Sequence, residues 1–159
     1  MTAPTLRVLM VCLGNICRSP TAEAMLRKHA HDAGLDDRIQ VDSAGTADYH
    51  VDSPPDRRAI AHGERRGLKM QQLRGRQVER ADFDRFDLVL AMDDDNLADL
   101  ERIRPSGARA RLGLLMAYAP RAGSRVVPDP YYGGADGFEK VLDLCDAAAV
   151  GIVAEVLSI

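Results

Sequence analysis

The sequence predicts an α/β protein in which a parallel β-sheet carries helices on both of its faces. Short apolar runs, each as long as a buried strand, alternate along the chain with segments whose apolar residues recur at helical spacing. Right-handed crossovers between such strands leave few topologies. The length of 159 residues agrees with one domain over residues 1–159, and no repeat, linker or low-complexity segment divides it.

The composition narrows the expected partners and location. Lys and Arg number 21 against 24 Asp and Glu, so the net charge of −3 provides no basic field for nucleic acid. No apolar run approaches the roughly 18 residues that span a bilayer, and the first residues lack the pattern of a signal peptide. The three cysteines form no regular framework, which indicates a reducing compartment. We therefore expect a cytoplasmic protein without a membrane span or a nucleic-acid partner.

Four segments are predicted to be strands. The runs from Leu6 to Val11, Ile39 to Ser43 and Phe86 to Ala91 are mostly apolar, as expected for the buried strands of a parallel sheet. A shorter strand is expected from Arg111 to Leu115. The proline- and glycine-rich stretch that follows it is expected to be loop.

Helices are predicted between these strands. Apolar residues recur at helical spacing from Ala22 to Ala33, and Gly34 then provides a stop. Ser53 is the expected cap of a second helix, with Pro54 at its first position and an end near Gly63.

Two more helices are predicted in the second half of the chain. One runs from Asp93 to Ile103. The other begins at an expected capping box of Asp136 and Glu139 and presents a long apolar stripe, as expected of a docked C-terminal helix. The stripe consists of Phe138, Val141, Leu142, Cys145, Ala149, Ile152, Val153 and Val156.

The segment between the first strand and the first helix, Cys12-Leu13-Gly14-Asn15-Ile16-Cys17-Arg18-Ser19, has the features of a phosphate-binding loop. A strand that turns into a helix N-terminus directs backbone N–H groups into one concavity, which binds anions. Gly14 permits a tight curl and Asn15 tolerates left-handed backbone. The Arg18 guanidinium can grip two phosphate oxygens. In α/β sheets, ligands bind at this carboxyl end of the strands.

Cys12 changes the expected chemistry of this loop from binding to catalysis. A thiol beside a helix N-terminus and Arg18 is favoured as a thiolate, and a thiolate in a phosphate site is a nucleophile aimed at phosphorus. Ser19 is expected to donate a hydrogen bond to that sulfur. Packing alone would explain a lone cysteine at a strand end, but not one followed by this glycine-containing loop and arginine.

Asp129 is the candidate general acid for a leaving oxygen. It lies between Pro128 and Pro130, which restrict the backbone on both sides. Tyr131 and Tyr132 follow it, in a chain with only 4 % aromatic residues, and can form the walls of a slot for an aryl ring. A simple turn aspartate is the alternative.

Taken together, these residues resemble the low-molecular-weight protein tyrosine phosphatases. The resemblance implies a four-stranded parallel sheet, with Cys12 forming a cysteinyl-phosphate and Arg18 clamping the transition state. It also implies that Asp129 protonates the tyrosyl oxygen and then activates water. The matching segments are Val11 to Pro20, Asp42 to Thr46, Pro54 to Asp56, Ala91 to Asp93 with Asn96, and Asp129 to Gly133.

The resemblance extends to the substrate site. It implies that Asn15 and Ser43 hold the loop in shape and that Tyr49, with His50 beside it, lines the substrate cleft. No metal or other cofactor is implied. The partner implied is a phosphotyrosine protein, by analogy a bacterial tyrosine kinase, with small aryl phosphates as substrates in vitro. The residues predicted to contact the substrate or its phosphate are Leu13, Gly14, Asn15, Ile16, Cys17, Ser19, Tyr49, Tyr131 and Tyr132.

The sequence departs from the family pattern at one position, and three alternative functions fit it less well. The family commonly has a histidine where this chain has Leu73, which leaves part of the hydrogen-bond network behind the loop unassigned. Thioredoxin-linked arsenate reductases need further cysteines near residues 80 to 90, where this chain has none. Protein-arginine phosphatases tend to carry Thr at the position of Ile16. A non-catalytic anion-binding module would lack Cys12, Arg18 or Asp129.

Two secondary roles stay open at this stage. Cys17 is either a small packed residue or a thiol that traps oxidised Cys12 as a reversible disulfide. Tyr131 and Tyr132 are either cleft walls alone or also sites of phosphorylation.

Overall fold

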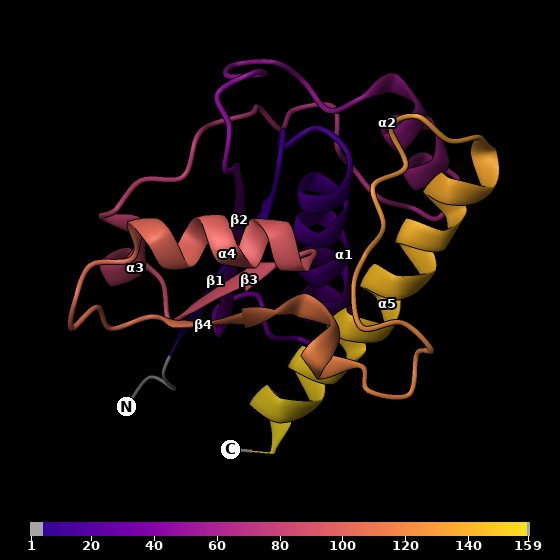
Figure 1. Ribbon diagram of the computed structural model, residues 1–159. Helices are drawn as coiled ribbons and strands as arrows, with labels where there is room; N and C mark the ends of the chain where they lie inside the picture. The colour runs from indigo at the N-terminus through magenta and orange to yellow at the C-terminus, as the bar shows by residue number, and fades with distance from the viewer. Residues whose placement is uncertain (1–4, 159) are drawn as a thin grey trace.

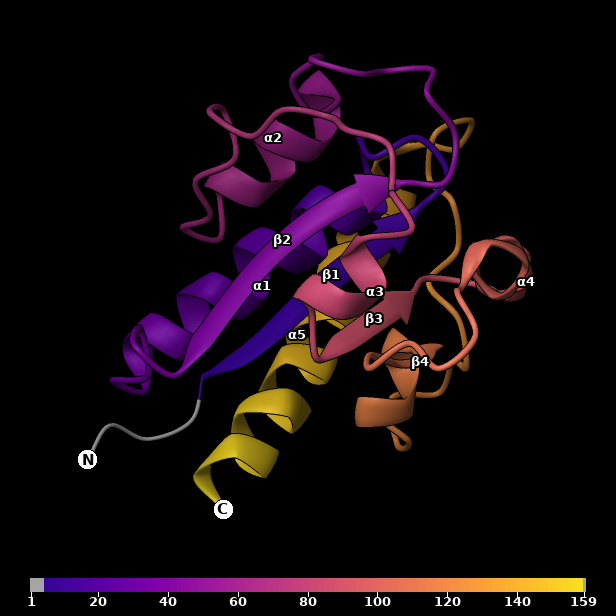
Figure 2. The ribbon, with the colours of Figure 1, turned by 90° about the vertical axis from the view of Figure 1, so that its left-hand side faces the viewer.

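The computed structural model describes residues 5–158 and has a single parallel sheet at its centre. The sheet contains β1 (Leu6–Cys12), β2 (Ile39–Gly45), β3 (Leu88–Ala91) and β4 (Arg111–Leu114). Their order across the sheet is β2-β1-β3-β4, and every neighbouring pair is parallel (Figure 2). The predicted α/β class with four parallel strands is confirmed.

The register brings the carboxyl ends of the strands to one edge of the sheet. Cys12 at the end of β1 lies opposite Gly45 of β2, while Val11 lies opposite Ala91 of β3. The chain moves from β1 to one side to form β2 and then crosses over to form β3 on the other side. The end of β1 is therefore the switch point at which α/β sheets bind ligands.

Helices cover both faces of the sheet, as predicted (Figure 1). One face carries α1 (Arg18–Asp32) and α5 (Ala135–Leu157), which pack against each other, and α2 (Arg57–Glu64) packs beside α5. The opposite face carries α3 (Asp82–Arg85) and α4 (Asp94–Ile103). Side-chain alternation along β1 divides the core accordingly, because successive strand residues point to opposite faces.

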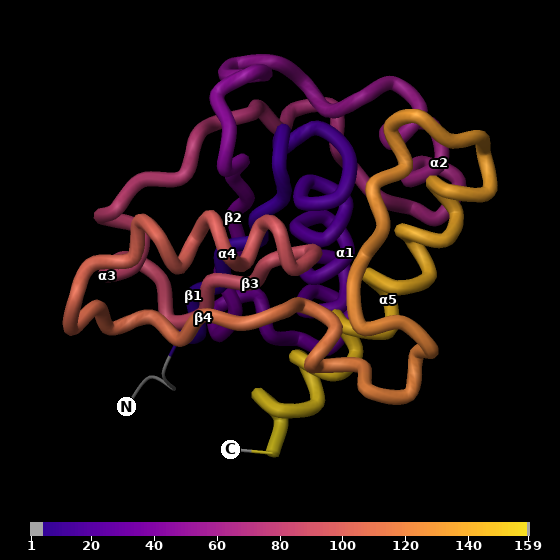
Figure 3. Tube along the Cα trace, viewed as in Figure 1, coloured from indigo at the N-terminus to yellow at the C-terminus, as the bar shows by residue number. Residues whose placement is uncertain are grey.

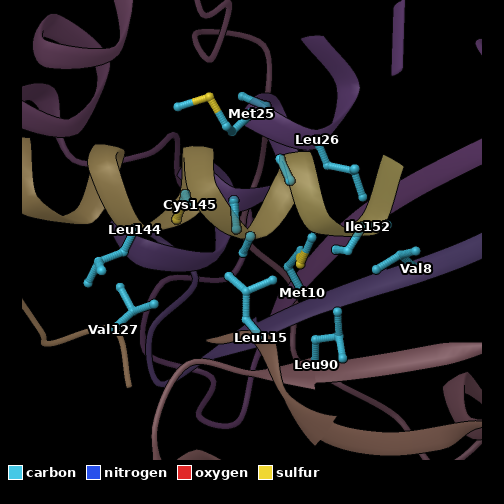
Figure 4. Packing of buried hydrophobic residues seen from close by; sticks show 14 of the residues in the cluster. Val8, Met10, Met25, Leu26, Leu90, Leu115, Val127, Leu144, Cys145 and Ile152 are labelled. Carbon is cyan, nitrogen blue, oxygen red and sulfur yellow. The ribbon is translucent and has the colours of Figure 1, made fainter. Parts of the chain in front are cut away.

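β1 supplies both halves of the core. Val8 and Met10 point into the larger cluster beneath α1 and α5, whereas Leu9 and Val11 point toward α3 and α4. Figure 4 shows Met10 together with Ile152 of α5 and side chains of α1 and the sheet. A strand buried on both faces explains why this segment is a nearly continuous apolar run.

The C-terminal helix buries the whole predicted stripe. All eight stripe residues are buried, and Leu144 and Ala148 extend the buried face. The start of α5 differs from the prediction. Gly134, without a side-chain cap, precedes the helix, and Asp136 lies within its first turn. Glu139 does not fold back onto the helix start, because its carboxylate pairs with His62 and Arg66.

The predicted start of α2 is wrong by several residues. Asp56, rather than Ser53, caps this helix, and its carboxylate accepts a hydrogen bond from the Arg58 N–H. A residue that precedes proline is disfavoured in the α region, so Pro55 prevents Pro54 from beginning the helix. Residues 53–56 instead form an extended segment that leads into α2.

The structure also contains two short elements that the sequence pattern did not predict. Phe86, predicted as the first residue of a strand, instead closes the single turn of α3, because its N–H donates to the Asp82 carbonyl. The strand β3 therefore begins only at Leu88. A 3-10 helix, η1 (Leu115–Tyr118), follows β4 directly. Figure 3 shows the long connection that leads from η1 to the start of α5.

Candidate active site

Two polar groups of the loop and of the start of α1 contact the Cys12 sulfur. The Asn15 N–H donates to Cys12 Sγ at 3.3 Å, and Ser19 Oγ lies 3.0 Å from the same atom. α1 begins at Arg18, directly behind the sulfur, so the positive end of its dipole faces the loop. Cys12 itself is only 2 % exposed. The sulfur is therefore buried within the loop, in contact with these two polar groups.

Asn15 holds the loop from inside through both ends of its amide. Its Nδ2 donates to Ser19 Oγ at 2.8 Å and to Ser43 Oγ at 3.0 Å, while its Oδ1 accepts from the Arg76 N–H at 3.1 Å. Its φ of +58° is the left-handed backbone that was expected there. The side chains of Asn15 and Ser19, predicted to contact phosphate, thus lie buried behind the loop.

The network behind the loop continues from Ser43 into α1. Ser43 Oγ donates to the Glu23 carboxylate at 2.6 Å. Burial raises the pKa of Glu23, although its bonds to Ser43 and Arg27 act in the opposite direction. Leu73, where the resemblance implies a histidine, packs against the apolar core.

Gly45 allows the end of β2 to approach this loop closely. A Cβ at this position would lie 2.7 Å from the Leu13 carbonyl oxygen, which is closer than such atoms approach in proteins. Next to it, the Thr46 N–H donates to the Cys12 carbonyl and the Ala47 N–H donates to the Leu13 carbonyl. The backbone of β2 therefore supports the loop from one side.

Arg18 is buried and held on one side of the pocket. Its Nη1 donates to Asp93 Oδ2 at 2.6 Å and to the Val127 carbonyl at 3.1 Å, and the side chain is 3 % exposed. Burial lowers the pKa of Arg18, but the Cys12 sulfur and Asp93 outweigh it and raise the pKa above its ordinary value. The guanidinium therefore stays charged with its orientation fixed.

Asp93 was predicted as the start of a helix and as part of a segment that resembles the family, but its contact with Arg18 was not predicted. It caps α4 by accepting from the Asn96 N–H, and the same carboxylate orients Arg18. The sequence signal for this contact was its position, because the Asp93 carboxylate lies two residues after the end of β3, the strand that neighbours β1.

Asp129 faces Arg18 across the pocket. Its Oδ2 lies 3.7 Å from Arg18 Nη2, and its Oδ1 accepts from the Tyr131 N–H at 3.0 Å. The carboxylate side chain is 44 % exposed, in contrast to Cys12 and Arg18. A group at this position can meet both a bound substrate and water.

These residues surround one pocket of about 250 Å³ at the carboxyl edge of the sheet. Tyr131 and Tyr132 meet edge to face at 4.9 Å between ring centroids, and Tyr49 stands at the mouth beside His50. The aromatic rings form an apolar mouth above a polar floor. The lining consists of Cys12, Leu13, Gly14, Ile16, Cys17, Arg18, Tyr49, His50, Asp129, Tyr131 and Tyr132.

Cys17 also lines the pocket, but in a different electrostatic environment from Cys12. Burial, with the Asp56 carboxylate as the next cause, raises the pKa of the Cys17 thiol to about 12. Cys145, buried in α5, has its pKa raised to about 12 mainly by burial. Both thiols are therefore protonated near neutral pH, and all three cysteines are free.

The described chain offers no obvious metal centre. Nowhere in residues 5–158 do three His, Cys, Asp or Glu side chains gather as they do around a bound metal ion. In the same residues, no helix combines the length and apolar character that a membrane crossing requires.

Comparisons with known proteins place these features in a family. The family model for low molecular weight phosphotyrosine protein phosphatase matches residues 7–158. A low molecular weight phosphotyrosine protein phosphatase of Schizosaccharomyces pombe is 45 % identical over 84 % of this chain and 85 % of its own length. The structure of an Entamoeba histolytica protein tyrosine phosphatase with Hepes in its active site superposes with a TM-score of 0.92. It is 35 % identical and covers 97 % of this chain and 98 % of its own.

The same fold also occurs in an enzyme named for another substrate. A Drosophila arginine phosphatase superposes with a TM-score of 0.88 at 32 % identity, covering 94 % of this chain and 97 % of its own. Both structures are similar to this chain over nearly their whole length. The family match over residues 7–158, together with the cysteine, arginine and aspartate in one pocket, identifies the chain as a member of the low molecular weight phosphotyrosine protein phosphatase family.

Proposed function

We propose that this protein hydrolyses phosphotyrosine through a cysteinyl-phosphate, with Cys12 as the nucleophile, Arg18 as the transition-state clamp and Asp129 as the general acid and base. One observation carries the proposal: the Cys12 sulfur, the Arg18 guanidinium and the Asp129 carboxylate line a single pocket, with Asp129 Oδ2 3.7 Å from Arg18 Nη2. A nucleophile, a fixed cation and an acid are the three groups that phosphoryl transfer to a thiolate requires.

The first step transfers the phosphoryl group to the enzyme. The Cys12 thiolate attacks phosphorus, the bond from phosphorus to the tyrosyl oxygen breaks, and protonated Asp129 gives its proton to that oxygen. The backbone N–H groups of the loop and the Arg18 guanidinium bind the equatorial oxygens, on which charge is spread. The Ser19 hydroxyl, 3.0 Å from the sulfur, can donate a hydrogen bond to it during the attack.

The second step restores the enzyme. Asp129, now a carboxylate, takes a proton from water as the water oxygen attacks phosphorus. The sulfur–phosphorus bond breaks, inorganic phosphate leaves and the Cys12 thiolate re-forms. The partial exposure of Asp129 supports this step, because water must reach the carboxylate.

The mouth of the pocket supports an aryl phosphate over an alkyl one. Tyr131, Tyr132 and Tyr49 present rings on which a tyrosyl ring can pack, and Ile16 adds an aliphatic contact. The arginine phosphatase fold shows that this architecture also serves a phosphorylated guanidinium, so the substrate must be tested directly. A phosphotyrosine peptide should be hydrolysed with a higher kcat/KM than the matched phosphoarginine peptide, and the reverse order would overturn the substrate assignment.

The proposed setting is cytoplasmic, in keeping with three free thiols, and the proposed partner is a phosphotyrosine protein such as a bacterial tyrosine kinase. The mechanism is tested with para-nitrophenyl phosphate in the presence of EDTA, with wild type and Cys12→Ser side by side. Wild type should be fully active and Cys12→Ser inactive. Loss of activity in EDTA, or activity that survives in the variant, would contradict the mechanism.

A further inference from the structure

The segment at the start of α2 contacts both loops of the active site. The Asp56 N–H donates to the Ile16 carbonyl of the phosphate loop at 2.8 Å. Two residues later, Arg58 Nη2 donates to the Tyr131 carbonyl at 3.0 Å, in the segment that carries Asp129. These two loops are far apart in sequence, and this segment bridges them.

We propose that Arg58 is a positioning residue, which fixes the segment after Asp129 so that the proposed general acid faces the phosphate. The inference rests on the proposed function, because it concerns the acid of that reaction. Arg58 does not line the pocket itself, so its effect must pass through Tyr131.

The Arg58 guanidinium is held in one orientation by three separate contacts. Its Nε and Nη2 donate to the two carboxylate oxygens of Asp56 at 3.1 and 3.0 Å. Its centre lies 4.7 Å from the Phe138 ring centroid and 5.4 Å from that of Tyr131. Planar stacking and a bidentate carboxylate are contacts that suit arginine and not lysine.

The surface behind the guanidinium is fixed as well. The Phe138 ring stacks on His62 with 5.6 Å between centroids and 7° between planes. Phe138 belongs to α5 and His62 to α2, so two packed helices hold this surface. Arg58 therefore links the packed helices α2 and α5 to the exposed segment that contains Tyr131.

The connection from Arg58 to Asp129 passes through one residue. The Tyr131 carbonyl accepts from Arg58, and the Tyr131 N–H donates to Asp129 Oδ1 at 3.0 Å. With Oδ1 occupied in this way, Oδ2 is the oxygen that lies 3.7 Å from Arg18. Loss of the Arg58 contact should therefore let Asp129 leave this orientation without disturbing Cys12 or Arg18.

The leaving group separates a positioning role from a general loss of structure. Phenol, with a pKa of about 10 like tyrosine, needs a proton as it departs, whereas the more acidic para-nitrophenol needs little help. Arg58→Gln should therefore lower kcat/KM for phenyl phosphate about tenfold and for para-nitrophenyl phosphate about twofold or less. Thermal unfolding checks that the variant is folded.

The neighbouring arginine provides the matched control. The Arg57 side chain is exposed. Within the described part of the chain, it does not bond to Asp56 or to Tyr131, the two partners of Arg58. Arg57→Gln removes the same charge and should leave both kcat/KM values unchanged. Arg58→Lys keeps the charge without the planar fork and should resemble Arg58→Gln. If Arg58→Gln does not fold, Arg58→Lys is compared with wild type on the same two substrates.

A double variant completes the test. If Arg58 acts through the acid, Arg58→Gln should have no further effect in an Asp129→Asn background. Equal losses for both substrates, full activity in Arg58→Lys, or an undiminished effect in the Asp129→Asn background would overturn the positioning role. The proposed function fails separately, if Cys12→Ser retains activity or if Asp129→Asn shows no selective loss on phenyl phosphate.

Discussion

The two loops that form the active site are built in opposite ways. The phosphate loop is buried and densely bonded: Cys12 and Arg18 are 2 % and 3 % exposed, and the Asn15 amide bonds at both ends. In the segment that carries the proposed acid, Asp129 is 44 % exposed and Tyr132 is 95 % exposed. Few contacts, among them that from Arg58, tie this segment to the rest of the protein.

The difference follows from what each loop must do. Stabilising a phosphoryl transition state requires donors that are already aimed before substrate arrives, because reorientation during the reaction costs free energy. An acid that protonates a leaving group and later deprotonates water must be reachable by both. A buried, fixed loop suits the first task and an exposed segment suits the second.

The largest loss of activity should come from replacing the planar guanidinium of the buried Arg18. Arg18→Lys keeps the positive charge but loses the guanidinium fork, which binds Asp93 in the structure and is proposed to bind the phosphoryl oxygens. We expect kcat/KM for para-nitrophenyl phosphate to fall roughly 10³-fold. Steady-state kinetics with phenyl phosphate as the second substrate should give a similar loss. A loss on only one of them would show that Arg18 does not act on the phosphoryl group.

Removing the acid should have a smaller and more selective effect. Asp129→Asn retains the size of the side chain, and we expect kcat for phenyl phosphate to fall roughly 10²-fold with little change in KM. The loss in kcat/KM should be clearly smaller for para-nitrophenyl phosphate than for phenyl phosphate. An increase in KM with unchanged kcat would indicate that Asp129 only binds substrate, and the contrast between the two loops would then need a different explanation.

Weakening the support of the phosphate loop should affect stability more than chemistry. Asn15→Ala removes three hydrogen bonds and places alanine at a φ of +58°, so the free energy of unfolding should fall by about 2 to 4 kcal/mol. We expect about a tenfold loss in kcat/KM, because the donors around Cys12 lose their fixed positions. Urea unfolding measures the stability.

Asn15→Gly serves as the matched variant for this prediction. Glycine adopts positive φ without strain but lacks the amide, so it should recover about 1 kcal/mol of the loss. If the alanine and glycine variants were both as stable as wild type, the network around Asn15 would not hold the loop.

The smallest effect on basal activity should come from Cys17→Ser, which we expect to stay within about twofold of wild type. Its effect should appear after peroxide, which oxidises the Cys12 thiolate to a sulfenic acid. The Cys17 thiol can then attack that sulfur to form a disulfide with release of water. Dithiothreitol should restore wild type but only part of the variant. Equal recovery of both would show that Cys17 has no protective role.

The pKa of Cys17 gives this redox step a pH dependence. Because burial raises that pKa to about 12, the thiolate fraction of Cys17 rises about tenfold per pH unit below this value. Disulfide closure, followed by quenching the free thiols at intervals after peroxide, should therefore accelerate between pH 6 and pH 9. A rate that is independent of pH would mean that Cys17 thiolate does not attack.

Local patterns predicted most of the framework. The predicted strand from Leu6 to Val11 is buried on both faces from Val8 onward, and the long apolar stripe of α5 is buried throughout. The helix starts were less predictable, because a cap depends on what else competes for its side chain. Asp56 caps α2 where Ser53 was expected, and Glu139 pairs with His62 and not with the start of its own helix.

The fold class and the phosphate loop could be predicted from local sequence, because Cys12, Arg18 and the loop between them lie in one continuous strand–loop–helix segment. The contacts that hold these groups could not, because they come from the packing of distant elements. Asp93 reaches Arg18 across 75 positions, and Arg58 reaches Tyr131 across 73. Such contacts depend on which strands and helices become neighbours, and no local spacing encodes that choice.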